Sequence, residues 1–439
     1  MTIDRRRFLT ASALGLTAAS RSGWLSQVAR AAEQTQAKSC ILLWMSGGPS
    51  QLDTLDPKPG TENGGEFSAI QTAVPGLQLA EHLPGLAQEL GDVALIRSMA
   101  TKEGEHGRAT YLGHTGRLPS GSIQYPTMGS FVSGALPDRP SELPEFVSVA
   151  PNRFLAPEAF SPGFLGSQAA PLVVGDVNIV RTVGEQTGLS IANLSPPASV
   201  SGDRVRRRLD FLTAVQGQFR DGRPDPILAS HQTAYAKAVR MMESDAAEAF
   251  ETDTEPAVLR DAYGQSLFGE GCLVARRLIE RGVKFVEVSL NGVDGNAGIG
   301  WDTHQDNFTA VRRLCGVLDP AWSTLIRDLR DRGLLDSTLV IWMGEFGRTP
   351  AINPTGGRDH SAAAWSTALC GAGIRGGQAV GRTSSDGTLI EDRPVTMPDF
   401  LATVCHALGV DPAETNLSNV GRPISLVELD ADPLTELLG

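Results

Sequence analysis

The chain has 439 residues and a formal net charge of −12. This length fits one large domain or several smaller ones. Apolar residues make up 41% of the chain and charged residues 20%. These proportions are ordinary for a globular protein and exclude a disordered, fibrous or polytopic membrane protein. The acidic net charge argues against a nucleic-acid-binding surface.

The N-terminal segment has the features of a targeting signal. Arg5, Arg6 and Arg7 precede the weakly apolar stretch 10–20, and residues 29–31 form a small-x-small cleavage site. The pattern resembles a twin-arginine signal, the bacterial route for proteins exported after folding. The alternative is a surface helix. We expect residues 1–31 to be a signal peptide, the twin-arginine export machinery to be a partner, and the mature protein to be periplasmic or extracellular with no transmembrane segment.

The five cysteines, Cys40, Cys272, Cys315, Cys370 and Cys405, all lie in apolar stretches. Cysteines of exported proteins commonly form disulfides, but an odd number leaves at least one of them unpaired. We interpret them mostly as small buried residues rather than as disulfide partners or zinc ligands.

Short apolar runs alternate with helical periodicity along the chain. The first run, Cys40–Met45, ends abruptly at the Gly-rich residues 46–50, which is typical of a buried strand that leads into a loop. Strands alternating with helices favour an α/β fold with a mostly parallel central sheet and helices on both faces. The further predicted strands are 93–99, 146–150, 283–290, 338–343 and 367–370, and the predicted helices are 204–219, 231–250, 257–281, 314–332 and 398–408.

Two stretches interrupt this alternation. The region between Gly104 and Pro140 is rich in Gly and Pro and is predicted to form loops. Residues 195–202 are predicted to be a linker, and the helices around 203–281 an insertion. We therefore expect a single α/β domain over residues 38–435 that carries this helical insertion.

Carboxylates and histidines follow two of the predicted strands. Ligands of open α/β sheets bind beyond the carboxyl ends of the strands. Asp302 and His304 follow strand 283–290, Glu345 follows strand 338–343, and His360 stands fifteen residues after Glu345. Such a ligand set suits Zn, Mn or Fe better than Mg or Ca. Each residue alone also fits a solvated loop or a turn cap, but their joint placement predicts a metal site.

The order of these residues resembles the alkaline phosphatase superfamily, which includes the sulfatases. More closely, the chain is similar to the exported, sulfatase-like family known as domain of unknown function 1501. The resemblance covers nearly all of residues 38–435 and implies an alkaline phosphatase-like fold. The segments that carry it are Leu43–Ser50, Asp53–Pro59, Leu273–Val288, Trp301–His304 and Gly344–Pro350.

The resemblance implies roles for the metal-type residues. Asp302 and His304 resemble the acid and the histidine that hold the first metal ion, and His360 resembles the late histidine that returns to it. Glu345 takes the place of the acid in an Asp-His pair, but Phe346 stands where the histidine would be. Because one ligand is missing, we expect one or two divalent ions, with Zn or Mn favoured.

The segment His106–Arg117 resembles the stretch in which sulfatases place their nucleophile, and the register puts His106 at the nucleophile position. Without Cys or Ser there, no formylglycine can form, and Thr110 replaces the arginine that would steady it. His106 is therefore a candidate nucleophile, general base or metal ligand, with a structural histidine as the alternative.

Several further residues flank the proposed ligands. Arg108, Arg348 and Arg358 are candidates to clamp an anionic ester, and Ser50 is a candidate anion-binding residue. The alternative for each arginine is a salt bridge to a nearby acid. Asp53 is a candidate replacement carboxylate for the metal site.

These inferences favour a metal-dependent hydrolase of phosphate or sulfate esters in the bacterial envelope, acting on an anionic small-molecule or polysaccharide ester. The alternative is a catalytically degenerate metal-binding or surface-assembly protein of the same fold. The missing histidine beside Glu345 and the absence of Cys or Ser at position 106 favour the alternative. The residues that favour the hydrolase are the retained Asp302, His304, Glu345 and His360.

Overall fold

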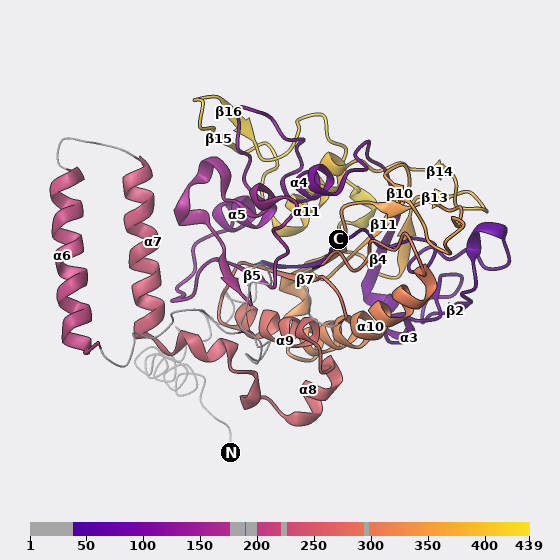
Figure 1. Cartoon of the computed structure of the whole chain (residues 1–439), viewed down its shortest axis with the longest axis horizontal. Coiled ribbons are helices and arrows are strands. Elements are labelled where there is room, and N and C mark those ends of the chain that lie inside the picture. Colours follow the sequence, from indigo (N-terminus) through magenta and orange to yellow (C-terminus); the bar gives the residue numbers. More distant parts are fainter. Residues whose placement is uncertain (1–37, 176–188, 190–199, 221–225, 294–297) are drawn as a thin grey trace, which may run out of the picture.

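The computed structural model describes residues 38–175, 189, 200–220, 226–293 and 298–439. At its centre lies an eight-stranded sheet in the order β12-β4-β11-β8-β1-β7-β5-β6 (Figure 1). Strand β11 is antiparallel to β4 and β8, and the other neighbours in the sheet pair in parallel. The prediction of a mostly parallel sheet is confirmed. The strands are β1 (Ser39–Met45), β4 (Val93–Met99), β5 (Phe146–Val149), β6 (Leu172–Val174), β7 (Phe285–Leu290), β8 (Thr338–Met343), β11 (Trp365–Cys370) and β12 (Gln378–Val380).

Strand β1 shows why this sheet has helices on both faces. All of its residues are buried, and successive side chains of a strand point to opposite faces. Ile41 and Leu43 enter one apolar core with α3 (Pro84–Glu89), α9 (Leu267–Glu280) and α10 (Asn307–Asp331). Leu42 and Trp44 enter a second core with α4 (His106–Thr115), α5 (Met128–Ala135) and α11 (Met397–Leu408). Figure 1 shows the two sets of helices on opposite sides of the sheet, as predicted.

Helices α4 and α5 occupy the stretch that was predicted to form loops. Their glycines weaken the helical signal in the sequence, but in the fold they allow close packing. A Cβ atom on Gly113 would lie 2.8 Å from the ring of Trp44, and one on Gly129 would lie 2.4 Å from the ring of Phe146. The loop prediction for this region was therefore wrong at both helices.

The predicted helix 257–281 is two helices. α8 (Ala257–Tyr263) ends at Gly264, which has a φ of 86°. α9 then begins after Ser266, whose side chain accepts a hydrogen bond from the backbone N–H of Gly269. A residue with positive φ stops a helix, and Ser is a favoured residue before a new one.

Helix α6 (Gly202–Arg220) is the outermost helix, and α7 (Pro226–Glu243) lies between it and the body (Figure 1). Helix α7 contacts the body, where its Lys237 pairs with Glu145 at 3.4 Å. None of the helices in the described part of the chain combines the length and apolar character needed to cross a bilayer. The predicted signal peptide 1–31 and residues 195–199 of the predicted linker lie outside the described residues. The single domain with its helical insertion stays a prediction.

The remaining strands form small two-stranded sheets at the periphery. All five cysteines are buried and unpaired, as the interpretation of small buried residues expects, and burial raises the pKa of the Cys40 thiol. The small sheets pair β2 (Ala69–Gln71) with β3 (Gln78–Ala80), β9 (Gly347–Arg348) with β10 (His360–Ser361), β13 (Arg382–Thr383) with β14 (Ile390–Asp392), and β15 (Thr415–Leu417) with β16 (Pro423–Ser425).

Candidate metal centre

The candidate site lies at one edge of the central sheet. Strands β1, β4, β7 and β8 run in the same direction, so the loops that follow them meet at that edge. The loop after β7 carries Asp302 and His304, the loop after β8 carries Glu345, and α4, after β4, begins with His106. His360 reaches the same place because β10 pairs with β9, which sets His360 opposite Arg348.

Gly47, directly after β1, ties these loops together. Its backbone N–H donates to Oε1 of Glu345 at 2.9 Å, and the backbone N–H of Trp301 donates to the carbonyl of Ser46 at 3.1 Å. Gly47 has a φ of 114°, and a Cβ atom on it would lie 2.4 Å from the backbone nitrogen of Asp302. Only glycine fits this conformation and this close approach.

Three imidazole nitrogens converge on one carboxylate oxygen. Oδ1 of Asp302 lies 3.1 Å from Nε2 of His304, 3.1 Å from Nε2 of His360 and 3.3 Å from Nε2 of His106. The Nε2 atoms of His304 and His360 are 3.0 Å apart. The structure thus brings together residues from the loop after β7, from β10 and from the start of α4.

The opposite nitrogen of each ring is held by a group that only accepts hydrogen bonds. Nδ1 of His304 lies 2.9 Å from Oδ1 of Asp359, Nδ1 of His360 lies 2.8 Å from the carbonyl of Gly104, and Nδ1 of His106 lies 2.8 Å from Oε1 of Glu345. These partners assign the proton of each neutral ring to Nδ1. In the neutral rings each Nε2 would present a lone pair toward Oδ1 of Asp302, an arrangement that needs a cation beside it. Without a bound ion a proton on His106, whose pKa is raised to about 9, supplies that positive charge.

Arg348 places a positive charge against the same carboxylate oxygen. Its side chain is completely buried, and one guanidinium nitrogen lies 2.7 Å from Oδ1 of Asp302. The other donors of this side chain go to the carbonyls of Gly47, Gly48 and Arg358. Because each of its nitrogens already donates a hydrogen bond to a protein acceptor, Arg348 acts as a fixed charge beside the cluster.

The pKa values of the cluster reflect this crowding. Burial alone would lower the pKa of His106, but the carboxylates of Asp302 and Glu345 outweigh it and raise the pKa to about 9. Burial would raise the pKa of Asp302, yet His106 and Arg348 hold it well below its usual range. Burial lowers the pKa of His360 despite the opposing effect of Asp302. The cluster therefore favours positive charge next to Asp302.

These residues fit a divalent ion. Ligand atoms around a tetrahedral ion with bonds of about 2.0–2.1 Å lie about 3.3 Å apart, close to the separations around Oδ1 of Asp302. The ligand atoms of His106, Asp302 and His360 all lie within 4.8 Å of one another. Among the described residues, Nε2 of His106 and Oε2 of Glu345 are buried without a hydrogen-bond partner. Imidazole with carboxylate suits Zn, Mn or Fe.

Asp53 and Arg358 lie outside this cluster. Both side chains are completely buried and form a two-pronged ion pair, with distances of 2.7 and 3.0 Å. Asn307 donates a further hydrogen bond to Asp53 at 2.8 Å, and the backbone N–H of Arg358 donates to the carbonyl of Thr303 at 3.0 Å. The pair fastens the loop that precedes His360 to the loop that carries Asp302 and His304.

The two other residues predicted for the site, Arg108 and Ser50, lie outside the cluster, and Arg108 lines a cavity beside α4. Nε of Arg108 donates to Oε2 of Glu103 at 2.6 Å, and half of the Arg108 side chain is exposed. Ser50 is buried, and its hydroxyl has no hydrogen-bond partner among the described residues. The catalytic or anion-binding roles of both stay predictions.

Sequence reasoning missed the groups that orient the histidines. Asp359 holds His304, and the carbonyl of Gly104 holds His360. A carboxylate that orients a metal-ligating histidine is common, and Asp359 stands directly before His360 in the chain. That adjacency was the available signal. The carbonyl of Gly104 has no counterpart in the sequence pattern.

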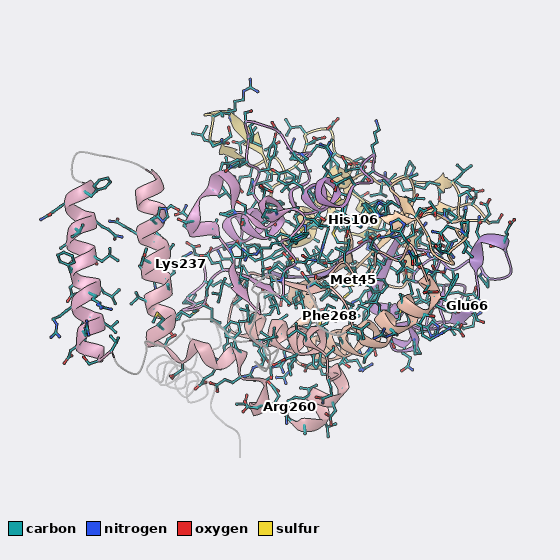
Figure 2. All side chains as sticks on the ribbon, in the orientation of Figure 1. Met45, Glu66, His106, Lys237, Arg260 and Phe268 are labelled. Carbon is teal, nitrogen blue, oxygen red and sulfur yellow. The ribbon has the colours of Figure 1, made fainter. Side chains whose placement is uncertain are left out.

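A cavity of about 420 Å³ opens beside the N-terminal half of α4. It is lined by the chain neighbours of His106, Glu105 and Gly107, together with Tyr111, Tyr125 and other residues. A second cavity, of about 470 Å³, lies at α8 and α9 around Arg260. None of the clustered residues lines either cavity. The first cavity is lined by the residues on both sides of His106 in the chain, whereas Figure 2 shows Arg260 well apart from His106.

The parallel sheet and the converging side chains at its carboxyl edge define an α/β protein with a candidate metal centre. The sequence matches, over residues 37–438, the family described as "Protein of unknown function (DUF1501)". The chain therefore belongs to this family. A comparison with curated proteins finds no match.

Several solved structures resemble this fold. The PsFucS1 sulfatase from Pseudoalteromonas sp. is 12% identical, with a TM-score of 0.41 over 86% of this chain and 69% of that one. The lipoteichoic acid synthase LtaP from Listeria monocytogenes is 11% identical, with a TM-score of 0.39 over 87% and 74%. The C-terminal periplasmic domain of EcEptC from Escherichia coli, in complex with Zn, is 9% identical, with a TM-score of 0.39 over 92% and 95%. Likenesses at this level do not assign an activity to this chain.

Proposed function

We propose that this protein is a hydrolase of phosphate or sulfate esters that depends on one divalent ion, Zn or Mn, held by Asp302, His304 and His360. The observation that carries the proposal is the convergence of the Nε2 atoms of His304 and His360 on Oδ1 of Asp302. The Nδ1 atom of each ring is bound to an acceptor that fixes the orientation of the ring. A bound divalent ion lowers the pKa of a bound water toward about 7 and neutralises the charge of an ester oxyanion.

Arg348 supports a single ion. Its guanidinium, 2.7 Å from Oδ1 of Asp302, would repel a second divalent ion on that side of the carboxylate. Each of its three nitrogens already donates to Asp302 or to a backbone carbonyl, which argues against a bidentate clamp on the substrate. Its part is to keep Asp302 ionised and in place. Elemental analysis of the loaded protein should give one ion per chain.

His106 acts beside the ion, either as a further ligand or as the general base for water. Its pairing with Glu345 at 2.8 Å orients the ring in the way that a carboxylate orients a catalytic histidine. His106→Ala separates the two roles. Loss of the ion identifies a ligand. Retention of the ion with loss of turnover, and a pH–rate profile without its acid limb, identifies a base.

The cavity beside α4 is the proposed place for the alcohol part of the ester. Its volume of about 420 Å³ lies within the range of small-ligand sites. The rings of Tyr111 and Tyr125 line it together with the exposed acid Glu158. An anionic small-molecule or polysaccharide ester would place its charged group at the ion and its alcohol in this cavity.

The test is turnover of aryl phosphate and aryl sulfate esters by purified protein that has been stripped with a chelator and reloaded with Zn or Mn. We expect no turnover without metal and restored turnover with one of the two ions. Failure of every metal and every ester across a range of pH would end the hydrolase proposal. The predicted envelope location is tested separately, by replacing Arg5 and Arg6 with Lys and following export.

The second candidate function is a metal-binding or surface-assembly protein without turnover. The structure favours it at one point, because the position at the start of α4 is His106 with its Nδ1 bound to Glu345, and a hydroxyl or thiol nucleophile is absent there. Tight binding of one ion without turnover would support this candidate.

A further inference from the structure

Helix α6 presents an exposed face that combines apolar and basic side chains. Phe211 and Val215 stand one turn apart and are 72% and 44% exposed, and Phe219, which is 53% exposed, continues the spacing. Residues four apart lie on the same face of a helix. Arg204 and Arg208, also exposed, precede Phe211 and Val215 at helical spacing and extend the same face toward the N-terminus of α6. We call Arg204, Arg208, Phe211 and Val215 the basic-apolar stripe.

The neighbouring face of α6 is covered to a greater degree. Val205, Leu209 and Leu212 are half-buried, so this face of the helix is less accessible than the stripe. Figure 1 shows α7 between α6 and the body, so α6 forms one end of the molecule, and Figure 2 shows side chains on both sides of this helix. A flat surface can therefore approach α6 without meeting the central sheet.

The charge of α6 is opposite to that of the chain. The helix contains five arginines and two aspartates, whereas the whole chain has a net charge of −12. Two of these arginines lie in the stripe, and Arg206 forms an exposed pair with Asp203 away from it. A partner that matches the stripe must be anionic and must also accept apolar side chains.

We propose that α6 is a membrane-docking helix that binds the surface of an anionic lipid bilayer through the basic-apolar stripe. The headgroup region of such a bilayer offers both matching environments, negative charge for Arg204 and Arg208 and the acyl boundary for Phe211 and Val215. A polyanion such as nucleic acid would satisfy the arginines but leave the apolar side chains in water. A second copy of the chain that used the same face would bring like charges together.

The experiment is flotation of the purified full chain with vesicles of phosphatidylcholine alone and of phosphatidylcholine with phosphatidylglycerol. We expect binding to the anionic vesicles only, weakened by added salt. The double variant Arg204→Gln/Arg208→Gln should lower the partition coefficient by about thirtyfold, since each arginine at an anionic surface contributes roughly a factor of five. Phe211→Ser/Val215→Ser should lower it by about tenfold or more.

The matched control removes two exposed arginines elsewhere, with Arg312→Gln/Arg382→Gln. Arg312 lies in α10 and Arg382 in β13, and both are at least half exposed. This variant should change the partition coefficient by less than about twofold, because charges farther than a Debye length from the bilayer contribute little. Circular dichroism and melting temperature check that every variant is folded.

Three results would overturn the proposal. The first is no flotation of the wild-type chain with anionic vesicles. The second is flotation that the stripe variants and the control lower equally. The third is a dimer in sedimentation that the stripe variants convert to a monomer, which would assign the stripe to a second copy of the chain. Vesicle binding requires neither metal nor turnover, so its outcome is independent of the proposed hydrolase.

Discussion

At the scale of single residues, the candidate site depends on how each histidine is oriented. A histidine that merely fills space would have either nitrogen free to face a neighbour. Here the Nδ1 atoms of His106, His304 and His360 all have acceptor-only partners, so the three Nε2 atoms face Asp302 together. This shared orientation distinguishes a binding site from an accidental group of polar side chains.

Replacing His360 with Ala tests whether this residue serves the ion or the fold. We expect the variant to lose most of its bound metal and to have a lower melting temperature than wild type when metal is present. With metal removed from both proteins, the difference should nearly vanish, because ion binding stabilises the folded state by mass action. Differential scanning fluorimetry with and without chelator measures both conditions.

His406→Ala is the control for that experiment. His406 is an exposed histidine of α11, so its removal should change neither the metal content nor the shift in melting temperature caused by metal. An equal loss of stability in His360→Ala with and without metal would identify His360 as a structural residue.

The sequence predicted several of the clustered residues and missed others for a physical reason. Asp302, His304 and Glu345 follow strands that could be located from their apolar runs, so their meeting at the sheet edge was predictable. The pairing of Asp53 with Arg358 joins residues 305 positions apart, and no local pattern shows that two side chains will neutralise each other. Asp53 was therefore proposed as a metal ligand, although both of its oxygens contact Arg358.

At the scale of elements, α4 is a helix that the local sequence pattern does not predict and that tertiary packing stabilises. Its glycines lower helix propensity, yet Gly113 lets the helix approach Trp44 of β1, and that approach sets the position of His106 at the start of the helix. The central strands were predictable because they are buried on both faces and read as continuous apolar runs. The helix that carries His106 was not.

Gly113→Ala tests this packing. The new methyl group would meet the buried ring of Trp44 at 2.8 Å, and overpacking of this kind typically costs about 1–3 kcal/mol. This packing cost exceeds the gain in stability of about 1 kcal/mol that comes from replacing a helical glycine with Ala. We expect lower stability in urea unfolding and weaker metal binding, because α4 moves away from β1 and takes His106 with it.

The matched control is Gly134→Ala in α5. A Cβ atom there meets nothing within 4 Å, so this variant should gain about 0.5–1 kcal/mol of stability and keep its affinity for metal. A Gly113→Ala protein that is as stable as Gly134→Ala would contradict the packing argument.

The contact between α9 and α10 depends on buried charge. The side chain of Arg276 in α9 is completely buried and lies 2.8 Å from Oδ2 of Asp328 in α10 and 2.9 Å from Oε1 of Glu255. Burial would raise the pKa of Glu255, but Arg277 and Arg276 outweigh it and lower the pKa. Glu255 is therefore ionised in the fold at pH values where the unfolded chain binds a proton.

The depressed pKa of Glu255 predicts an acid-sensitive contribution to stability. A carboxyl whose pKa is lower in the folded state than in the unfolded state stabilises the fold at pH values above its unfolded pKa, here near 4.5. This stabilisation is lost as the pH falls through the pKa of the folded state. Glu255→Gln should cost about 2 kcal/mol at neutral pH, because it removes one of the carboxylates that pair with the buried Arg276 and leaves Asp328 and Glu280 as its remaining partners. Urea unfolding from pH 7 downward should show this difference shrinking below pH 4.5.

Glu391→Gln, which removes an exposed acid paired with Arg382, is the control and should cost less than about 1 kcal/mol at every pH. A difference between wild type and Glu255→Gln that stays constant through the acid range would mean that Glu255 is not coupled to the arginines.

At the scale of the whole molecule, burial divides the described chain into a rigid body and one loosely attached element. Every residue of β1 and β8 is buried at the centre of the sheet. The described side chains of α6 are exposed or half-buried along the whole helix, and α7 lies between α6 and the body. The metal centre lies in the rigid body, and the basic-apolar stripe lies on the loosely attached helix α6.

This division predicts a wide range of amide hydrogen exchange. Local opening requires little free energy where few apolar contacts are lost, so the amides of α6 should exchange by local unfolding and be among the fastest helical amides of the protein. The amides of β1 and β8 should exchange only by global unfolding. Mass spectrometry of peptides from 202–220, 39–45 and 338–343 measures this, with α9, a helix of the body with a buried face, as the internal reference. Metal should slow exchange near the candidate site and leave α6 unchanged, whereas protection of α6 equal to that of α9 would mean that the helix is held by contacts beyond α7.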